Sequence, residues 1–282
     1  MASYLLRSKR EIKKMRTAGL VVWEAHQSAA RMIGPGVTTA EINQVYIDVF
    51  ARHEATPLFL NYGGTEDRPP FPAEICASVN EQVVHGIPGE RKLVPGDIIS
   101  VDTGCKVSAW CGDAAVTIPI GQIDSRTKEL LDVTQQTLDL AIEAMSRCRW
   151  WSEVAKEMQA FVEGHGFTVV EEMVGHGIGK NLHEAPQVPN YPSDELLASE
   201  DFELQSGLVI AVEPMINQGV ADIVEADDGW TINTADGKPS AHYEHTLAVT
   251  DDGIMRLTGP PNDQELESMP DWLREKANWL LW

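Results

Sequence analysis

Residues 101–113 read VDTGCKVSAWCGD, with one aspartate, Asp102, near the start and a second, Asp113, at the end. The stretch follows GDIIS and precedes AAVTIPI, and short β-branched runs bounded by glycine are typical of strands. The polar segment 104–108 favours a turn. A hairpin here would bring the two carboxylates towards one point. Two interpretations stay open: the aspartates bond only to nearby backbone groups, or they share a metal ion.

Composition limits the classes of protein to which the chain can belong. Its 282 residues suffice for one large domain or two small ones, and 43% hydrophobic with 23% charged residues is ordinary for a soluble globular protein. A net charge of −21 opposes general binding to DNA or to anionic membranes, because long-range repulsion would have to be overcome. The N-terminus is charged where a signal peptide is apolar, no apolar run has the length of a membrane span, and the four cysteines form no CxxC pair. We therefore expect a soluble, cytoplasmic protein with no DNA or membrane partner.

The periodicity predicts one α+β domain in which two helices followed by strands occur twice. Capping boxes at Ser8/Glu11 and Thr38/Glu41 mark the starts of the first two helices. The segment 175–192 is so rich in glycine and proline that we expect a long ordered loop there, neither helix nor strand. The expected helices are 8–33, 38–53, 126–147 and 152–164, and the expected strands are 74–79, 97–103, 110–118, 167–172, 207–213, 229–233 and 241–250.

The C-terminal segment reads MPDWLREKANWLLW and is rich in tryptophan. Trp272, Leu273, Trp279 and Leu280 would share one face of a helix. We expect residues 1–262 to form a single catalytic domain and residues 263–282 to form an extension, a short amphipathic helix packed back onto that domain. A segment that binds a partner or a membrane surface is the alternative.

Five further segments each carry a potential metal ligand or proton carrier. Taken singly, each has an ordinary structural explanation, and AHYEHT could use its histidines rather than its glutamate. The segments are NEQVVHGIPG with His85, GHGIG with His176, NLHEAP with His183, AVEPM with Glu213 and AHYEHT with Glu244.

Their combination favours a metal site. Glu213 ends the apolar run GLVIAVE, and a buried carboxylate is costly unless a positive charge compensates it. No Lys or Arg occurs between Lys180 and Lys238, whereas a divalent cation would compensate several carboxylates together. The sequence contains no HExxH pair and no GxSxG elbow, which argues against a zincin and against a serine nucleophile.

The ordered set NEQVVHGIP, VDTGCKVSAWCGD, GHGIGKNLHEAPQVPNY, VEPM and AHYEHT resembles the type I methionine aminopeptidases. The resemblance extends over most of the chain, from about Ser8 to Leu257. It implies the pita-bread fold, with two pseudo-symmetric halves around an antiparallel curved sheet. It also implies a site for two divalent metal ions (Co, Mn, Fe or Zn) held by Asp102, Asp113, His176, Glu213 and Glu244.

The same resemblance implies an activity and roles for individual residues. The enzyme would remove the initiator methionine from nascent proteins with a small second residue, by means of a hydroxide activated by two metal ions. Glu213 would exchange a proton with that water, His183 would donate a hydrogen bond to the developing oxyanion, and His85 would contact the scissile amide nitrogen. The methionine side chain would lie in an apolar pocket formed by Tyr62, Phe71, Cys76, Leu182 and Trp230.

Several positions depart from the pattern of that family. The insertion GGTEDRPP separates Tyr62 from Phe71, and Leu182 replaces a frequent aromatic residue. Cys111 stands where the family often has His, and His242 stands where it often has Gln. These departures concern the width of the pocket and the surroundings of the ligands rather than the five ligands themselves.

Two other functions and one partner are considered beside this interpretation. A proline-specific peptidase of the same fold would generally carry a large extra N-terminal domain, for which the chain before Asp102 is too short. A non-catalytic pita-bread binding protein would be expected to have lost metal ligands. The basic segment Arg7–Arg16 is a candidate contact with the ribosome, where the nascent polypeptide N-termini emerge.

Overall fold

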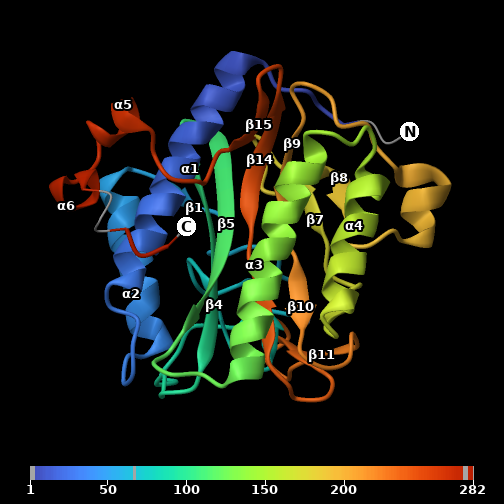
Figure 1. Cartoon of the computed structure of the whole chain (residues 1–282). Helices are drawn as coiled ribbons and strands as arrows, with labels where there is room; N and C mark the ends of the chain where they lie inside the picture. The colour runs from blue at the N-terminus through green and yellow to red at the C-terminus, as the bar shows by residue number, and fades with distance from the viewer. Residues whose placement is uncertain (1–3, 66–67, 276–278, 282) are drawn as a thin grey trace.

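Helices and antiparallel sheets alternate along the chain in the computed structural model (Figure 1). The structure describes residues 4–65, 68–275 and 279–281. No described helix combines the length and the apolar character that crossing a lipid bilayer requires.

The first half of the fold packs two helices against a β-hairpin. Helix α1 (Lys9–Ala30) lies across β4 (Ile98–Val107) and β5 (Trp110–Pro119), and helix α2 (Thr39–Arg52) packs beside α1. Both predicted capping boxes are present, since Ser8 and Thr38 each exchange hydrogen bonds with a glutamate three residues later. Strands β1 (Thr56–Pro57) and β2 (Cys76–Val79) pair with β4, and β3 (Gln82–Val84) joins a separate small sheet.

The second half repeats this order with helices α3 (Ser125–Met145) and α4 (Trp151–Gly164), which pack side by side in Figure 1. Beyond them lie a five-stranded sheet in the order β15-β14-β9-β7-β8 and a three-stranded sheet in the order β13-β10-β6. Strand β12 pairs with β3 of the first half on one side and with β11 on the other. The bounds are β6 Thr168–Val169, β7 Gly175–Gly177, β8 Glu184–Val188, β9 Val209–Val212, β10 Met215–Asn217, β11 Ile223–Glu225, β12 Ile232–Thr234, β13 Ser240–His242, β14 His245–Thr250 and β15 Gly253–Arg256, with a short π-helix at Leu196–Glu200.

The two halves meet where β5 runs beside β14. The side-chain hydroxyl of Thr246 accepts a hydrogen bond from the backbone N–H of Asp113 at 3.0 Å and donates one to its carbonyl oxygen at 2.8 Å. On the other side of β5, a Cβ atom added to Gly112 would lie 2.6 Å from the backbone nitrogen of Gly19 in α1. Gly112 therefore allows α1 to approach the strand that carries Asp113, which fixes that strand between the two halves.

The segment 175–192 differs from the expected loop, because it contains strands β7 and β8. A Cβ atom at Gly175 would lie 2.4 Å from the carbonyl oxygen of Ala211, and one at Gly177 would lie 2.2 Å from that of Ala185. Glycine here permits close backbone contact within a sheet rather than a turn. The sequence composition alone does not separate these two uses of glycine.

The C-terminal segment forms two short helices, α5 (Asp263–Leu266) and α6 (Asp271–Arg274), in place of the single helix expected from its sequence. Leu273 is fully buried, and Trp279 packs edge-on against Trp23 of α1 with 5.2 Å between ring centroids. The guanidinium of Arg16 donates hydrogen bonds to Glu265 and to four carbonyl oxygens of residues 256–260. These contacts attach the segment to the outer face of α1; residues 276–278 and Trp282 lie outside the described residues.

Candidate metal centre

The β4–β5 hairpin places the two aspartates of the segment 101–113 on one face of the sheet. Asp102 pairs with Ala115, and Asp113 pairs with Gly104, so the two carboxylates are diagonal neighbours. A Cβ atom at Gly104 would lie 3.0 Å from Oδ1 of Asp113. Gly104 therefore leaves room for the Asp113 carboxylate, and the two carboxylates converge as the sequence predicted.

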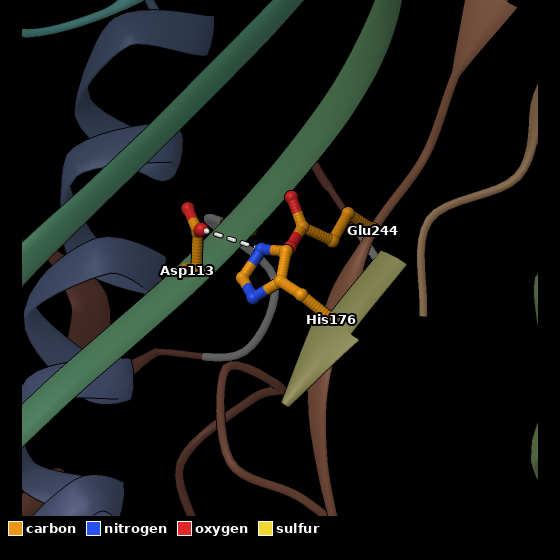
Figure 2. Close-up of side chains that lie close together, drawn as sticks. All are labelled: Asp113, His176 and Glu244. Atoms are coloured by element: carbon orange, nitrogen blue, oxygen red, sulfur yellow. Dashed lines mark ion pairs between the residues drawn. The ribbon is translucent and has the colours of Figure 1, made fainter. Parts of the chain in front are cut away.

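The other three predicted ligands come from the second half. His176 lies on β7, Glu213 follows β9, and Glu244 lies between β13 and β14, where its backbone N–H donates to the carbonyl oxygen of Ala115 at 2.9 Å. The Nε2 atom of His176 lies 3.7 Å from Oδ2 of Asp113 and 3.6 Å from Oε1 of Glu213. In Figure 2, the side chains of Asp113, His176 and Glu244 point towards one another from three different strands and loops. Their ligand atoms all lie within 4.8 Å of one another.

The electrostatics of this cluster fit a cation. Burial and neighbouring carboxylates raise the pKa of Asp102, Asp113 and Glu244 well above the usual range, and burial raises the pKa of Glu213 to about 8. One buried oxygen of each of Asp102, Asp113 and Glu244 has no hydrogen-bond partner. Among the described residues, no Lys or Arg forms an ion pair with these four carboxylates.

The imidazole in the cluster has the protonation state that a metal ligand needs. Burial lowers the pKa of His176 to about 4, so the ring is neutral near pH 7. Its Nδ1 lies 3.0 Å from the carbonyl oxygen of Gly177, which leaves Nε2 facing the carboxylates. Oxygen atoms with one imidazole nitrogen form a set suited to hard or borderline divalent ions. The residues present therefore fit the two-ion site that the sequence predicts.

His242 is not one of the five predicted ligands, but it lies beside them, as the resemblance implied. Its Nε2 lies 3.4 Å from Oε2 of Glu213, and burial lowers its pKa to about 3. Glu213, His242 and Glu244 form a second group with ligand atoms within 4.8 Å of one another. The pattern AHYEHT contains this signal, but His245 of the same motif lies 2.9 Å from Thr258, away from the centre. Sequence alone did not distinguish the two histidines.

A cavity of about 360 Å³ opens onto the carboxylate cluster. The predicted pocket residues line it, and Phe71, Cys76, Leu182 and Trp230 are all buried. Phe71 packs edge-on against Trp230 with 5.3 Å between ring centroids, and the indole N–H of Trp230 donates to the carbonyl oxygen of Pro69 at 2.9 Å. The cavity thus has an apolar wall next to its carboxylate wall.

The predicted proton carriers lie on this same cavity. His85 has a positive φ of 59° and lies edge-on to Trp230, with 6.4 Å between ring centroids. Burial lowers the pKa of His85 to about 4, so the ring is neutral near pH 7. His183 is exposed, and its ring centroid lies 4.3 Å from that of His176. Burial of part of its ring lowers the pKa of His183 as well.

The insertion 63–70 does not separate the two residues that flank it. Asn61 donates its backbone N–H to the carbonyl oxygen of Phe71 at 2.8 Å, and Phe71 donates to that of Tyr62 at 2.9 Å. These two hydrogen bonds close the base of the insertion and hold Tyr62 beside Phe71. Arg68, which belongs to the insertion, lines the cavity. Its guanidinium carbon lies 4.0 Å from the ring centroid of Trp230.

Comparisons with known proteins agree with this geometry. Residues 13–251 match the model of metallopeptidase family M24. Methionine aminopeptidase 1 of Bacillus subtilis is 40% identical over 254 residues, which are 90% of this chain and 98% of that protein. Methionine aminopeptidase A of Synechocystis is 41% identical over 254 residues, which are 90% of this chain and 96% of that protein.

Solved structures give the same result for the fold. The methionine aminopeptidase of Thermotoga maritima superposes with a TM-score of 0.84 at 38% identity, covering 91% of this chain and 99% of that one. A prolidase from Pyrococcus furiosus superposes with a TM-score of 0.69 at 18% identity, and the match covers only 66% of its length, so this second likeness concerns the fold alone. The predicted α+β pita-bread fold is confirmed. The chain belongs to metallopeptidase family M24.

Proposed function

We propose that this protein is a methionine aminopeptidase that removes the initiator methionine from nascent proteins with a small second residue. The observation that carries the proposal is the meeting of four carboxylates and His176 at the end of an apolar cavity. Relatives named methionine aminopeptidase, matched over almost their whole length, support the same activity.

Asp102, Asp113, His176, Glu213 and Glu244 would hold two divalent ions. Such ions supply a nucleophile near neutral pH by lowering the pKa of water, and they polarise a carbonyl group. The unpartnered oxygens of the buried carboxylates support this assignment, because a buried carboxylate without a partner is costly.

Three residues would handle protons and charge during hydrolysis. Glu213 would take a proton from water and pass it on, and its position 3.6 Å from Nε2 of His176 supports this role. His183 would donate a hydrogen bond to the substrate carbonyl oxygen as negative charge develops there. His85 would contact the scissile amide nitrogen and assist its departure as an amine.

The apolar wall would hold the methionine side chain. Cys76, Leu182, Phe71 and Trp230 surround it, with Tyr62 at the mouth, where the tyrosine is 41% exposed. A cavity of about 360 Å³ is in the range of small-molecule sites. Leu182 is smaller than an aromatic residue, so the pocket would be wider on that side.

The direct test is methionine release from peptides that begin Met-Ala and Met-Pro, with Leu-Ala and Ala-Pro peptides as controls. The enzyme is stripped of metal and then restored with Co, Mn, Fe or Zn, and Asp113→Asn is the blank. Release confined to the Met-initiated peptides, dependent on metal and lost in the variant, is expected. Cleavage only before proline, whatever the first residue, would indicate a proline-specific peptidase, and no cleavage with any ion would indicate a binding protein.

Only part of the basic segment Arg7–Arg16 is available for the proposed contact with the ribosome. Arg7 forms an ion pair with Glu184, and Arg16 holds the C-terminal segment. Lys9, Arg10, Lys13 and Lys14 are exposed on α1 and would form the contact. Reversing these four charges is expected to reduce co-sedimentation with ribosomes, and unchanged co-sedimentation would remove the proposal.

The proposed substrate also implies a cellular location for the enzyme. New N-termini emerge in the cytoplasm, so a cytoplasmic location accompanies the proposed activity. Residues 1–262 would form the catalytic domain, and residues 263–282 would stabilise it through α1. Burial of Leu273 and the contact between Trp279 and Trp23 support this division.

A further inference from the structure

Tyr62 makes a contact with His183 that the proposed function does not use. The hydroxyl oxygen of Tyr62 lies 2.6 Å from Nδ1 of His183, and the two rings are edge-on with 5.2 Å between centroids. Among the described residues, this hydroxyl has no other hydrogen-bond partner, and Nε2 of His183 has none. Both residues line the cavity beside the carboxylate cluster.

The backbone holds Tyr62 at this position. Its N–H donates to the carbonyl oxygen of Phe59 at 2.9 Å, and its own carbonyl oxygen accepts from Phe71 at 2.9 Å. Phe71 is in turn buried against Trp230. The hydroxyl is therefore presented by a fixed segment rather than by a free loop, although the side chain itself is accessible.

The direction of this hydrogen bond and the tautomer of His183 depend on each other. A neutral imidazole has one N–H donor and one acceptor nitrogen, and the partner of one nitrogen decides which tautomer is present. Among the described residues, Nδ1 of His183 is the acceptor within hydrogen-bond distance of the Tyr62 hydroxyl. If Tyr62 donates to Nδ1, the ring proton of His183 must lie on Nε2.

We propose that Tyr62 is a positioning residue that fixes His183 as the Nε2–H tautomer and directs that N–H into the cavity. This inference rests on the proposed function, in which His183 donates a hydrogen bond to the substrate carbonyl oxygen. A ring with its proton on Nδ1 would present an acceptor to that oxygen and would repel the developing negative charge. Tyr62 thus excludes the unproductive tautomer.

The tautomer is measured directly, without metal or substrate. Protein labelled with ¹⁵N-histidine is studied by long-range ¹H–¹⁵N NMR in the metal-free state at pH 7.5, and His183→Ala identifies the signals of His183. The wild type is expected to show an unprotonated Nδ1 and a protonated Nε2, and Tyr62→Phe is expected to show a mixture. A protonated Nδ1 in the wild type, or the same pattern in Tyr62→Phe, would overturn the proposal.

Kinetics on the metal-loaded enzyme provide a second measurement. With a Met-Ala peptide, Tyr62→Phe is expected to lower kcat about fivefold, the equivalent of the ~1 kcal/mol typical of one hydrogen bond, with KM nearly unchanged. In the His183→Ala background, Tyr62→Phe is expected to have no further effect. Multiplying effects in the double variant, or a change confined to KM, would mean that Tyr62 only lines the pocket.

Tyr4→Phe is the matched control. Its hydroxyl donates to the carbonyl oxygen of Glu203 at 2.9 Å, and Tyr4 does not line the cavity. This variant is expected to leave both kcat and the His183 signals unchanged. If the wild type releases no methionine from any peptide, the proposed function fails, whereas the NMR measurement still decides the tautomer.

Discussion

Asp113→Asn is expected to stabilise the metal-free protein and to remove most of its stabilisation by divalent ions. Asp113 is buried, one of its oxygens has no partner, and ligand atoms of His176 and Glu244 lie within 4.8 Å of its own. Without a cation, the charges of the neighbouring carboxylates oppose folding. An asparagine has almost the same shape and removes one of these charges.

The structure sets the size of the effect. Two unit charges 4.8 Å apart repel by about 3.5 kcal/mol at an effective dielectric constant of 20. Part of this repulsion is already relieved, because burial and the charge of Glu213 raise the pKa of Asp113 and favour its protonated form. Burying an amide also has a cost, so we expect a net gain of about 1–2 kcal/mol, or about 2–3 °C in Tm for a chain of this size.

The assay is thermal unfolding with and without metal. Chelator-treated Asp113→Asn is expected to melt above the chelator-treated wild type, and the order is expected to reverse when a divalent ion is added, because a ligand that binds only the native state stabilises it. Asp48→Asn, on the exposed face of α2, is the control and is expected to change stability by less than about 0.5 kcal/mol. A metal-free variant less stable than the wild type, or equal stabilisation of both by metal, would refute the reasoning.

Three further predictions concern the pocket, the hairpin and the C-terminal segment. Leu182→Phe narrows the methionine pocket and is expected to disfavour a peptide beginning with ethionine over one beginning with methionine by about tenfold in kcat/KM; an unchanged ratio would place Leu182 outside the pocket. Gly104→Ala puts a methyl group 3.0 Å from Oδ1 of Asp113 and is expected to weaken metal affinity about tenfold in calorimetric titration, and unaltered affinity would show that Asp113 tolerates the shift. For Glu265, burial raises the pKa, but hydrogen bonds from Arg16 and Asn262 outweigh burial and lower it, so its stabilising contribution is present above the unfolded-state pKa near ~4.3 and is lost as pH falls. Glu265→Gln is therefore expected to lower Tm at pH 7 and to have progressively less effect as the pH falls below the unfolded-state pKa of the glutamate, whereas a difference independent of pH would contradict an ionic role.

The residues indicated a metal site because several carboxylates end or interrupt apolar strands, and the resemblance to a known family supplied the full set of five ligands. Asp102 and Asp113 lie on the two strands of one hairpin. Glu213 follows the buried strand β9, and no Lys or Arg lies near it in the sequence. Polar groups at such positions need compensation, whatever the details of the fold. The positions of these carboxylates can therefore be recognised from the sequence alone.

Contacts between distant segments could not be predicted in the same way. Whether His242 or His245 faces the carboxylates depends on the bend between β13 and β14, and both residues are buried. The contact between Tyr62 and His183 joins two loops that are far apart in the chain. The glycines of β7 indicated a loop because composition does not reveal which backbone lies against them.

Titration of the metal-stripped enzyme with a divalent ion, followed by methionine release from a Met-Ala peptide, tests the central claim most directly. The account predicts no release in the presence of a chelator, activity that rises with added ion, and no recovery in Asp113→Asn at any ion concentration that restores the wild type. Full activity of the chelated enzyme, or equal recovery in the variant, would contradict a reaction centred on these five ligands.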